Sequence, residues 1–165
     1  MTKVPFLIEL DVVREKDIAD KIIDTGATHS IPFRDWQEKG KHSKVYEIDL
    51  EYVRYRPDNG RLKTEVLTYE TNVKKLDQTS DETQEIIRDF IGKSDKKKNE
   101  DLEKALFKVG QKEPATITSD GYLINGNRRK WALSSLREKY GQEKFKKIKV
   151  VILPGSTEPD KPTLI

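Results

Sequence analysis

The chain has 165 residues, with 32 lysines and arginines against 29 aspartates and glutamates, so its net charge is only +3. Hydrophobic residues make up 34% of the sequence, which is enough for one compact domain and excludes a wholly disordered chain. The absence of cysteine excludes disulfides, thiolate metal sites and a cysteine nucleophile. No apolar run reaches membrane-spanning length and no signal peptide is recognisable, so we expect a soluble cytoplasmic protein without a membrane partner.

Residues 1–44 are predicted to form a helical N-terminal extension. Apolar residues spaced among charges predict a helix over residues 11–23, which Gly26 would end. Pro32 begins a second, short predicted helix that stops at Gly40. We expect these residues to be either an extension of the domain that follows or a cap on its core.

Residues 46–53 alternate apolar and acidic side chains, which is the two-residue period of a β-strand. Glu47, Asp49 and Glu51 would then lie on one face of that strand. Three carboxylates at this spacing bind a cation, supply a general base or, most often, form the solvent-facing side of an edge strand. Residues 56–61 predict a turn, and the next 18 residues, 62–79, fit either a strand or a loop.

Two helices are predicted in the middle of the chain. Ser80 or Asp81 caps the first, which Gly92 would end. A charged connection follows, and the second helix stops at Gly110.

A β-hairpin and a helix are predicted next. Residues 115–118 and 122–124 are the two strands, and Asp120-Gly121 forms the turn between them, because this dipeptide between β-branched or apolar runs favours a hairpin. A helix over residues 127–140 follows the turn. Its predicted buried stripe is Ala132, Leu133, Leu136 and Tyr140.

The end of the chain contains one more predicted strand, over residues 148–153. Residues 154–165 are rich in proline, glycine and polar residues, so they are predicted to be a linker or tail. The expected division is therefore an extension (1–44), a domain (45–153) and a tail (154–165).

The turn before the 127–140 helix carries the clearest chemical signal. A helix N-terminus presents unpaired N–H groups and the positive end of the helix dipole, which stabilise an anion. Gly126 allows a ligand to approach the backbone, and Arg128 and Arg129 add guanidinium groups that bond phosphate oxygens. The alternative is purely structural, with Asn127 as an N-cap and two surface arginines.

Residues 127–149 contain nine lysines and arginines against two glutamates. Such a segment attracts phosphate, so we consider nucleic acid as a partner, with a solvated surface as the alternative. The aromatic residues that favour base stacking or, more often, core packing are Trp36, Trp131, Tyr52 and Tyr55.

The order of these elements resembles the ParB/sulfiredoxin superfamily. The similar features are a Gly-x-x-x-Pro segment at residues 110–114, the hairpin, the Gly-Asn-Arg-Arg block at 126–129 and the apolar strand after its helix. The strand at 46–53 with the turn at 56–61 is similar to that family's first box, so the match covers about residues 45–153. The resemblance implies an α+β fold, a small mixed sheet flanked by helices.

The same resemblance implies a nucleotide site. By it, Gly126, Arg128 and Arg129 hold phosphates, and Gln111 and Pro114 line the nucleotide pocket. The implied ligand is a nucleoside triphosphate such as CTP or ATP, with Mg²⁺ as a weaker expectation. The implied activities are NTP hydrolysis or nuclease cleavage in a nucleic-acid-associated protein. A homodimer is kept open as the assembly.

Three departures from the family pattern limit these expectations. Asn127 replaces the usual glutamate, and an amide is a poor ligand for a hard cation, so metal-assisted hydrolysis is in doubt. The family's later phosphate-binding box and its helix-turn-helix would lie beyond Ile165, so we do not expect sequence-specific DNA reading. Sulfiredoxin chemistry needs a cysteine in this turn, and there is none.

Three functions therefore remain open from the sequence. The first is an NTP-binding ParB-like domain. The second is a non-catalytic module that docks nucleic acid or a protein. The third is a ParB-like small-molecule kinase with Glu51 or Asp49 as its catalytic base. No metal-ligating set is predicted.

Overall fold

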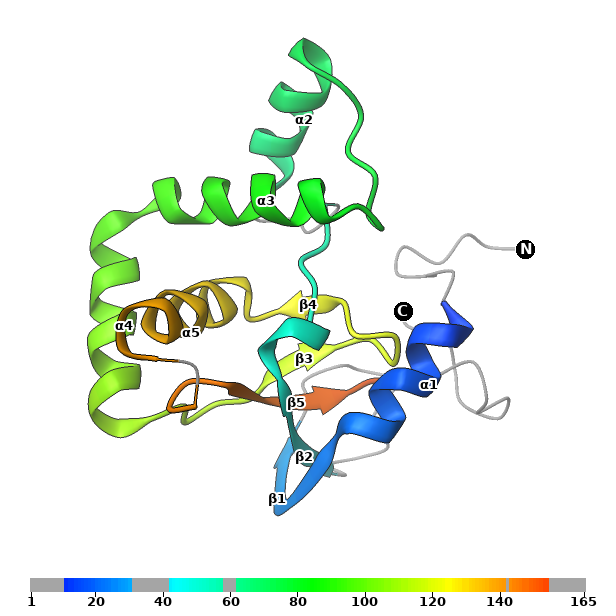
Figure 1. Cartoon of the computed structure of the whole chain (residues 1–165), viewed down its shortest axis with the longest axis vertical. Helices are drawn as coiled ribbons and strands as arrows, with labels where there is room; N and C mark the ends of the chain where they lie inside the picture. Colours follow the sequence, from blue (N-terminus) through cyan, green and yellow to red (C-terminus); the bar gives the residue numbers. More distant parts are fainter. Residues whose placement is uncertain (1–10, 31–41, 58–61, 142, 155–165) are drawn as a thin grey trace.

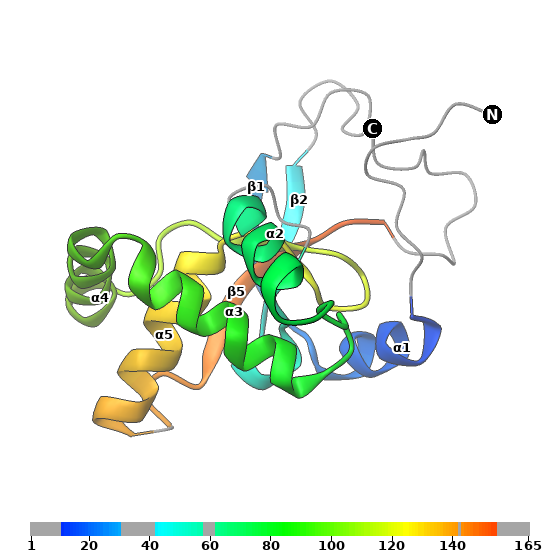
Figure 2. The same ribbon diagram turned by 90° about the horizontal axis from the view of Figure 1, so that it is seen from above.

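The computed structural model describes residues 11–30, 42–57, 62–141 and 143–154. These residues form one five-stranded mixed sheet with helices around it (Figure 1). Figures 1 and 2 both show α3, α4 and α5 gathered on one side, with α1 at the opposite end of the sheet. The predicted α+β class, a small mixed sheet flanked by helices, is confirmed.

The sheet has the strand order β1-β2-β5-β3-β4. Its strands are β1 (Ile23–Ser30), β2 (His42–Asp49), β3 (Ala115–Ile117), β4 (Leu123–Asn125) and β5 (Lys147–Ile152). The pairs β1/β2, β2/β5 and β3/β4 are antiparallel, and β3/β5 is parallel. The β3–β4 hairpin turns at Asp120-Gly121 and β5 follows the last helix, as the sequence predicts.

Five α-helices lie within the described residues, and three of them have a side-chain cap at the N-terminus. They are α1 (Val12–Lys21), α2 (Lys63–Asn72), α3 (Asp81–Ser94), α4 (Lys96–Val109) and α5 (Asn127–Tyr140). The side chains of Asp11, Ser80 and Asp95 accept N-cap hydrogen bonds at α1, α3 and α4. Two glycines with positive φ follow α4 and α5 at their C-termini, Gly110 and Gly141.

The core lies between the central strands and α3 and α5. Ile48 on β2, Ile117 on β3 and Ile148 on β5 are fully buried, and so are Ile87 on α3 and Ala132 on α5. The sheet thus buries one face under α3 and α5, and this packing fixes the direction in which α5 leaves β4.

The N-terminal segment differs from the predicted helical extension. Only the helix predicted over residues 11–23 is confirmed, as α1, and Ile18 on it is buried in the main core. The following residues form β1, which pairs with β2 and has a register shift between Asp24 and Thr28, around Gly26. Gly26 therefore lies in an irregular strand and does not end a helix.

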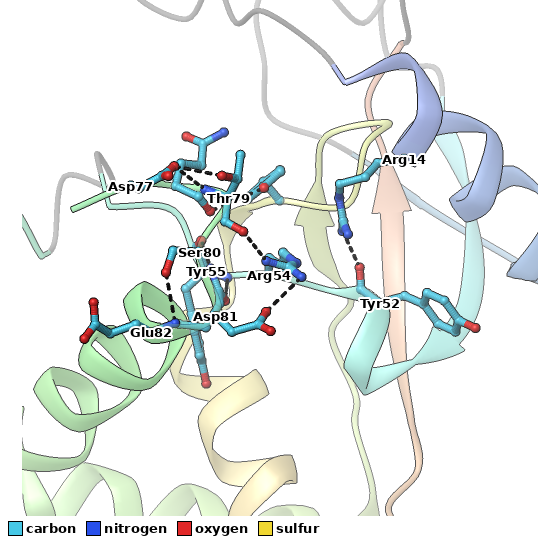
Figure 3. A network of polar contacts seen from close by, with 12 residues as sticks. Arg14, Tyr52, Arg54, Tyr55, Asp77, Thr79, Ser80, Asp81 and Glu82 are labelled. Atoms are coloured by element: carbon cyan, nitrogen blue, oxygen red, sulfur yellow. Dashed lines mark hydrogen bonds and ion pairs between the residues drawn. The ribbon is translucent and has the colours of Figure 1, made fainter.

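Side chains of two arginines tie α1 and α3 to the segment that follows β2 (Figure 3). The Arg14 guanidinium donates to the carbonyl of Tyr52 at 2.8 Å, and Arg54 donates to the carbonyl of Thr79 and to Asp81, both at 3.2 Å. Because the Arg54 carbonyl also accepts from Leu123, this segment is bonded to the hairpin as well.

Two predicted boundaries are wrong. β2 ends at Asp49 and a 3-10 turn, η1 (Leu50–Tyr52), follows it, because the Asp49 side chain accepts from the Glu51 amide. Gly92 lies inside α3, where a β-carbon would come within 3.0 Å of the Trp131 indole nitrogen, so it serves close helix packing.

Other expectations resolve differently or lie outside the described residues. The ambiguous residues 62–79 contain α2. The second predicted helix, at 32–39, most of the predicted turn at 56–61 and nearly all of the tail fall outside the described ranges.

Candidate functional site at the N-terminus of α5

Gly126 joins β4 to α5 in a conformation that suits glycine. Its φ of 98° is left-handed, and a β-carbon there would come within 2.6 Å of the Ala115 β-carbon. Before it, the Asn125 side chain accepts from the Thr116 amide at 3.0 Å and so fixes the end of the hairpin. Gly126 is therefore needed for the turn and for packing on β3, whether or not a ligand approaches it.

The first turn of α5 has no side-chain cap, because glycine occupies the N-cap position. Its N–H groups open beside a cavity of about 420 Å³, a volume within the range of small-molecule sites. The residues that line it are Leu62, Ile91, Ser94, Leu102, Ile124, Asn125, Gly126, Asn127, Arg128 and Arg129. The structure thus brings the predicted residues 126–129 together at one hollow with an apolar wall.

Arg128 lies against α3 and α4 in this cavity. One of its terminal nitrogens donates to the Asn99 side-chain oxygen at 2.6 Å and to the Ser94 hydroxyl at 3.4 Å. Asn99 is buried and donates in turn to the carbonyls of Ile91 and Gly92. The guanidinium is therefore held in place by a buried amide, which leaves its other N–H donors for a ligand.

Arg129 points to a different partner. Its guanidinium pairs with the exposed carboxylate of Glu113 at 3.1 Å. An exposed ion pair of this kind contributes little to stability, so an incoming anion competes with Glu113 at small cost.

The purely structural alternative from the sequence has Asn127 as the N-cap of α5. In the structure Gly126 occupies the N-cap position, so that part of the prediction is wrong. Asn127 is buried in the first turn of α5, and its side-chain oxygen has no hydrogen-bond partner among the described residues. A buried acceptor without a partner costs free energy, roughly 1–3 kcal/mol. This amide is the unsatisfied polar group nearest to the two arginines in sequence.

Gln111 and Pro114 do not line the cavity. The Gln111 amide exchanges hydrogen bonds with the backbone of Lys149, at 2.7 and 2.9 Å, and so holds the loop after α4 against β5. Pro114 immediately precedes β3. The geometry gives Gln111 a structural role in this conformation.

The carboxylates expected as bases lie elsewhere. Glu51 is exposed on η1, so it does not share a strand face with Glu47 and Asp49. Asp49 caps η1 and faces Arg137 at 3.6 Å and Lys146 at 3.9 Å. Arg137 lies about three helical turns, roughly 16 Å, along α5 from Gly126, and Asp49 does not line the cavity.

Lys130 and Tyr55 form a cation–π contact that the sequence analysis did not predict. The Lys130 ammonium lies 4.9 Å from the centre of the Tyr55 ring, and the Tyr55 hydroxyl is buried without a partner in the described ranges. Burial lowers the pKa of Lys130 to about 8, with further lowering by Arg88, Arg137 and Arg54 and an opposing effect of Glu85. Only the three-dimensional arrangement reveals this, because Tyr55 and Lys130 are far apart in sequence.

Several other cations of the basic segment are engaged within the protein. Lys139 pairs with Glu103 at 3.0 Å. Glu138, one of the two acidic residues in the segment, accepts two hydrogen bonds from Arg88, which lower its pKa and join α3 to α5. The local excess of positive charge is thus partly neutralised.

No group of three histidine, aspartate or glutamate side chains among the described residues is placed to hold a metal ion. Nor does any described helix combine the length and apolar character needed to cross a membrane.

Comparisons with known proteins give one structural similarity. No protein-family profile and no curated protein matches the chain. It is similar to a solved Pnob8-like ParB-N domain, with 17% sequence identity and a TM-score of 0.38, over 72% of this chain and 32% of that chain. This chain spans about a third of the length of that solved chain.

Proposed function

We propose that this domain binds a nucleoside triphosphate, such as CTP or ATP, with its phosphates at the N-terminus of α5. The observation that carries the proposal is the cavity at which an uncapped helix N-terminus, Arg128 and Arg129 meet an apolar wall. Backbone N–H groups, the helix dipole and two guanidinium groups all favour polyanionic phosphate there.

The two arginines suit different parts of such a ligand. Arg128 is fixed by Asn99, so it is preorganised and loses little conformational freedom on binding. Arg129 is held only by an exposed pair with Glu113 and can turn toward the ligand. The apolar wall, which includes Leu62 and Leu102, offers contact area for a nucleobase.

Binding is better supported than turnover. The residues that line the cavity include no carboxylate, and Asp49 is engaged with Arg137 and Lys146. The kinase base expected from the sequence is therefore not at the first turn of α5, and the carboxylate of Glu113 beside that turn is paired with Arg129. NTPase and nuclease activity stay secondary proposals that need an additional contributing group.

The experiment is calorimetric titration of the chain with CTP, ATP and GTP, with and without Mg²⁺. Arg129→Ala is the test variant, because its removal leaves no buried partner unpaired. Lys75→Ala is the control, since it removes one exposed positive charge from a different part of the surface.

We expect the wild type to bind at least one nucleotide saturably. The affinity for that nucleotide should fall about tenfold or more in Arg129→Ala and stay unchanged in Lys75→Ala. A folded wild-type protein that binds none of the nucleotides would contradict the proposal. Equal affinity in wild type and Arg129→Ala would show that the ligand lies elsewhere.

A further inference from the structure

A second surface lies at the opposite end of α5, where it meets the end of α4. Three large apolar side chains are exposed there or nearby along the chain: Phe107 is 44% exposed, Val109 61% and Tyr140 56%. Tyr140 was predicted to be buried, and this prediction is wrong because the stripe of α5 turns to the surface in its last turn. Exposed apolar side chains that gather in one patch are a feature of interaction sites.

These aromatic rings are held by the core. Phe145, in the turn after α5, is buried and belongs to the main hydrophobic cluster. The Phe107 ring centre lies 4.8 Å from that of Tyr140 and 6.1 Å from that of Phe145. We call Phe107, Tyr140 and Phe145 the aromatic corner. Because it is anchored by Phe145, it is a preformed platform and not a set of loose side chains.

Exposed lysines accompany the aromatic corner. The Lys144 ammonium lies 4.4 Å from the centre of the Phe107 ring and 5.6 Å from that of Phe145. Lys104 and Lys108 are one helical turn apart on α4, next to Phe107. None of these three lysines forms an ion pair with a described residue, while Glu143 is the exposed acid nearest to Lys144 in sequence. The surface therefore combines aromatic area with uncompensated positive charge.

We propose that the aromatic corner and Lys104, Lys108 and Lys144 bind single-stranded nucleic acid. Bases stack on aromatic side chains regardless of their identity, and lysines beside the rings neutralise the phosphates between them. The Lys144 ammonium that covers Phe107 would move to a phosphate when a base takes its place. A duplex hides its base faces, so it can use the lysines but not the rings.

This surface is separate from the nucleotide cavity. The 14 residues of α5 span roughly 20 Å, and the two sites lie at its two ends. The inference therefore does not rest on the proposed nucleotide binding.

The test is fluorescence anisotropy of the full chain with a labelled single strand of about 12 thymidines, beside a duplex of the same length. The first variant is Phe107→Ala with Tyr140→Ala. Its control is Leu67→Ala with Val73→Ala, which removes two apolar side chains exposed on and beside α2. The second variant changes Lys104, Lys108 and Lys144 to glutamine. Its control changes three other exposed lysines to glutamine, Lys63, Lys75 and Lys96.

We expect the protein to bind the single strand more tightly than the duplex. The affinity for the single strand should fall about tenfold or more in the aromatic variant. In the lysine variant, the slope of the logarithm of the binding constant against the logarithm of the salt concentration should be smaller in magnitude by about 2. Both controls should bind as the wild type does. The inference is overturned if no oligonucleotide binds, if duplex binds as well as single strand, or if the aromatic variant keeps full affinity.

Discussion

The two ends of α5 carry cationic side chains in opposite settings. At the N-terminus, Arg128 is fixed by the buried Asn99, and an apolar wall encloses the cavity beside it. At the C-terminus, Lys144 lies over the exposed ring of Phe107 without a carboxylate partner among the described residues. The difference teaches how the two proposals diverge: a fixed guanidinium beside a cavity suits one ligand of defined shape, while exposed rings and lysines suit a sequence-tolerant partner.

The glycines at the two ends give the largest expected contrast in stability. Gly126→Ala should destabilise the protein by about 3 kcal/mol or more, because φ is 98° and the new β-carbon meets Ala115 at 2.6 Å. Gly141→Ala should cost about 1–2 kcal/mol, since its φ is also positive but nothing lies within 4 Å. Urea unfolding of the two variants measures both values, and equal losses would contradict the packing argument.

The two arginines of the cavity should also differ. Arg128→Ala leaves the Asn99 oxygen without its donor in a buried position, so we expect a loss of about 1–2 kcal/mol. Arg129→Ala breaks only an exposed pair with Glu113 and should change stability by less than about 0.5 kcal/mol. Thermal and urea unfolding compare them. A larger loss in Arg129→Ala would mean that its ion pair is structural.

Lys130 predicts a pH dependence of stability. Its pKa is about 8 in the folded protein and 10.5 when unperturbed, so the unfolded chain binds more protons between these values and stability rises with pH over that range. Lys130→Met should therefore be more stable than wild type at pH 7, by about 1–3 kcal/mol, and the advantage should shrink toward pH 10. Urea unfolding at several pH values tests this. A constant difference across the range would show that the ammonium carries no burial cost.

Substitution of Asn127 should change stability only slightly, and the sign of that change is informative. Asn127→Leu replaces a buried amide that has an unpartnered oxygen with an apolar group of similar shape, so stability should stay the same or rise by about 1 kcal/mol. If the amide is retained for a ligand, nucleotide affinity should fall in the same variant. A destabilised Asn127→Leu would show that the amide is satisfied in solution.

The elements predicted best from the sequence are those fixed by local chemistry. The Asp120-Gly121 turn and the start of α5 after Gly126 both depend on residues next to them, and both are confirmed. β1 was missed because its residues are mostly exposed and alternate poorly, and pairing with β2 alone makes them a strand. Gly92 was misread as a helix end because its contact with Trp131 is not visible in sequence.

The candidate site was predictable only in its cluster at 126–129. Charge and turn chemistry indicate those residues, and the structure places them around one cavity. The partners that decide what each arginine can do, Asn99 and Glu113, come from distant elements. Asp49 was predicted as a base from strand periodicity, which could not show that it caps η1 and faces Arg137.

The most direct test of nucleotide binding at the N-terminus of α5 is a titration of the ¹⁵N-labelled protein with CTP and ATP, followed by amide chemical shifts. The account predicts that the largest shifts occur at Gly126, Asn127, Arg128 and Arg129, while Phe107 and Tyr140 at the other end stay unchanged. Shifts confined to Phe107 and Tyr140, or no shifts in a well-folded sample, would contradict it.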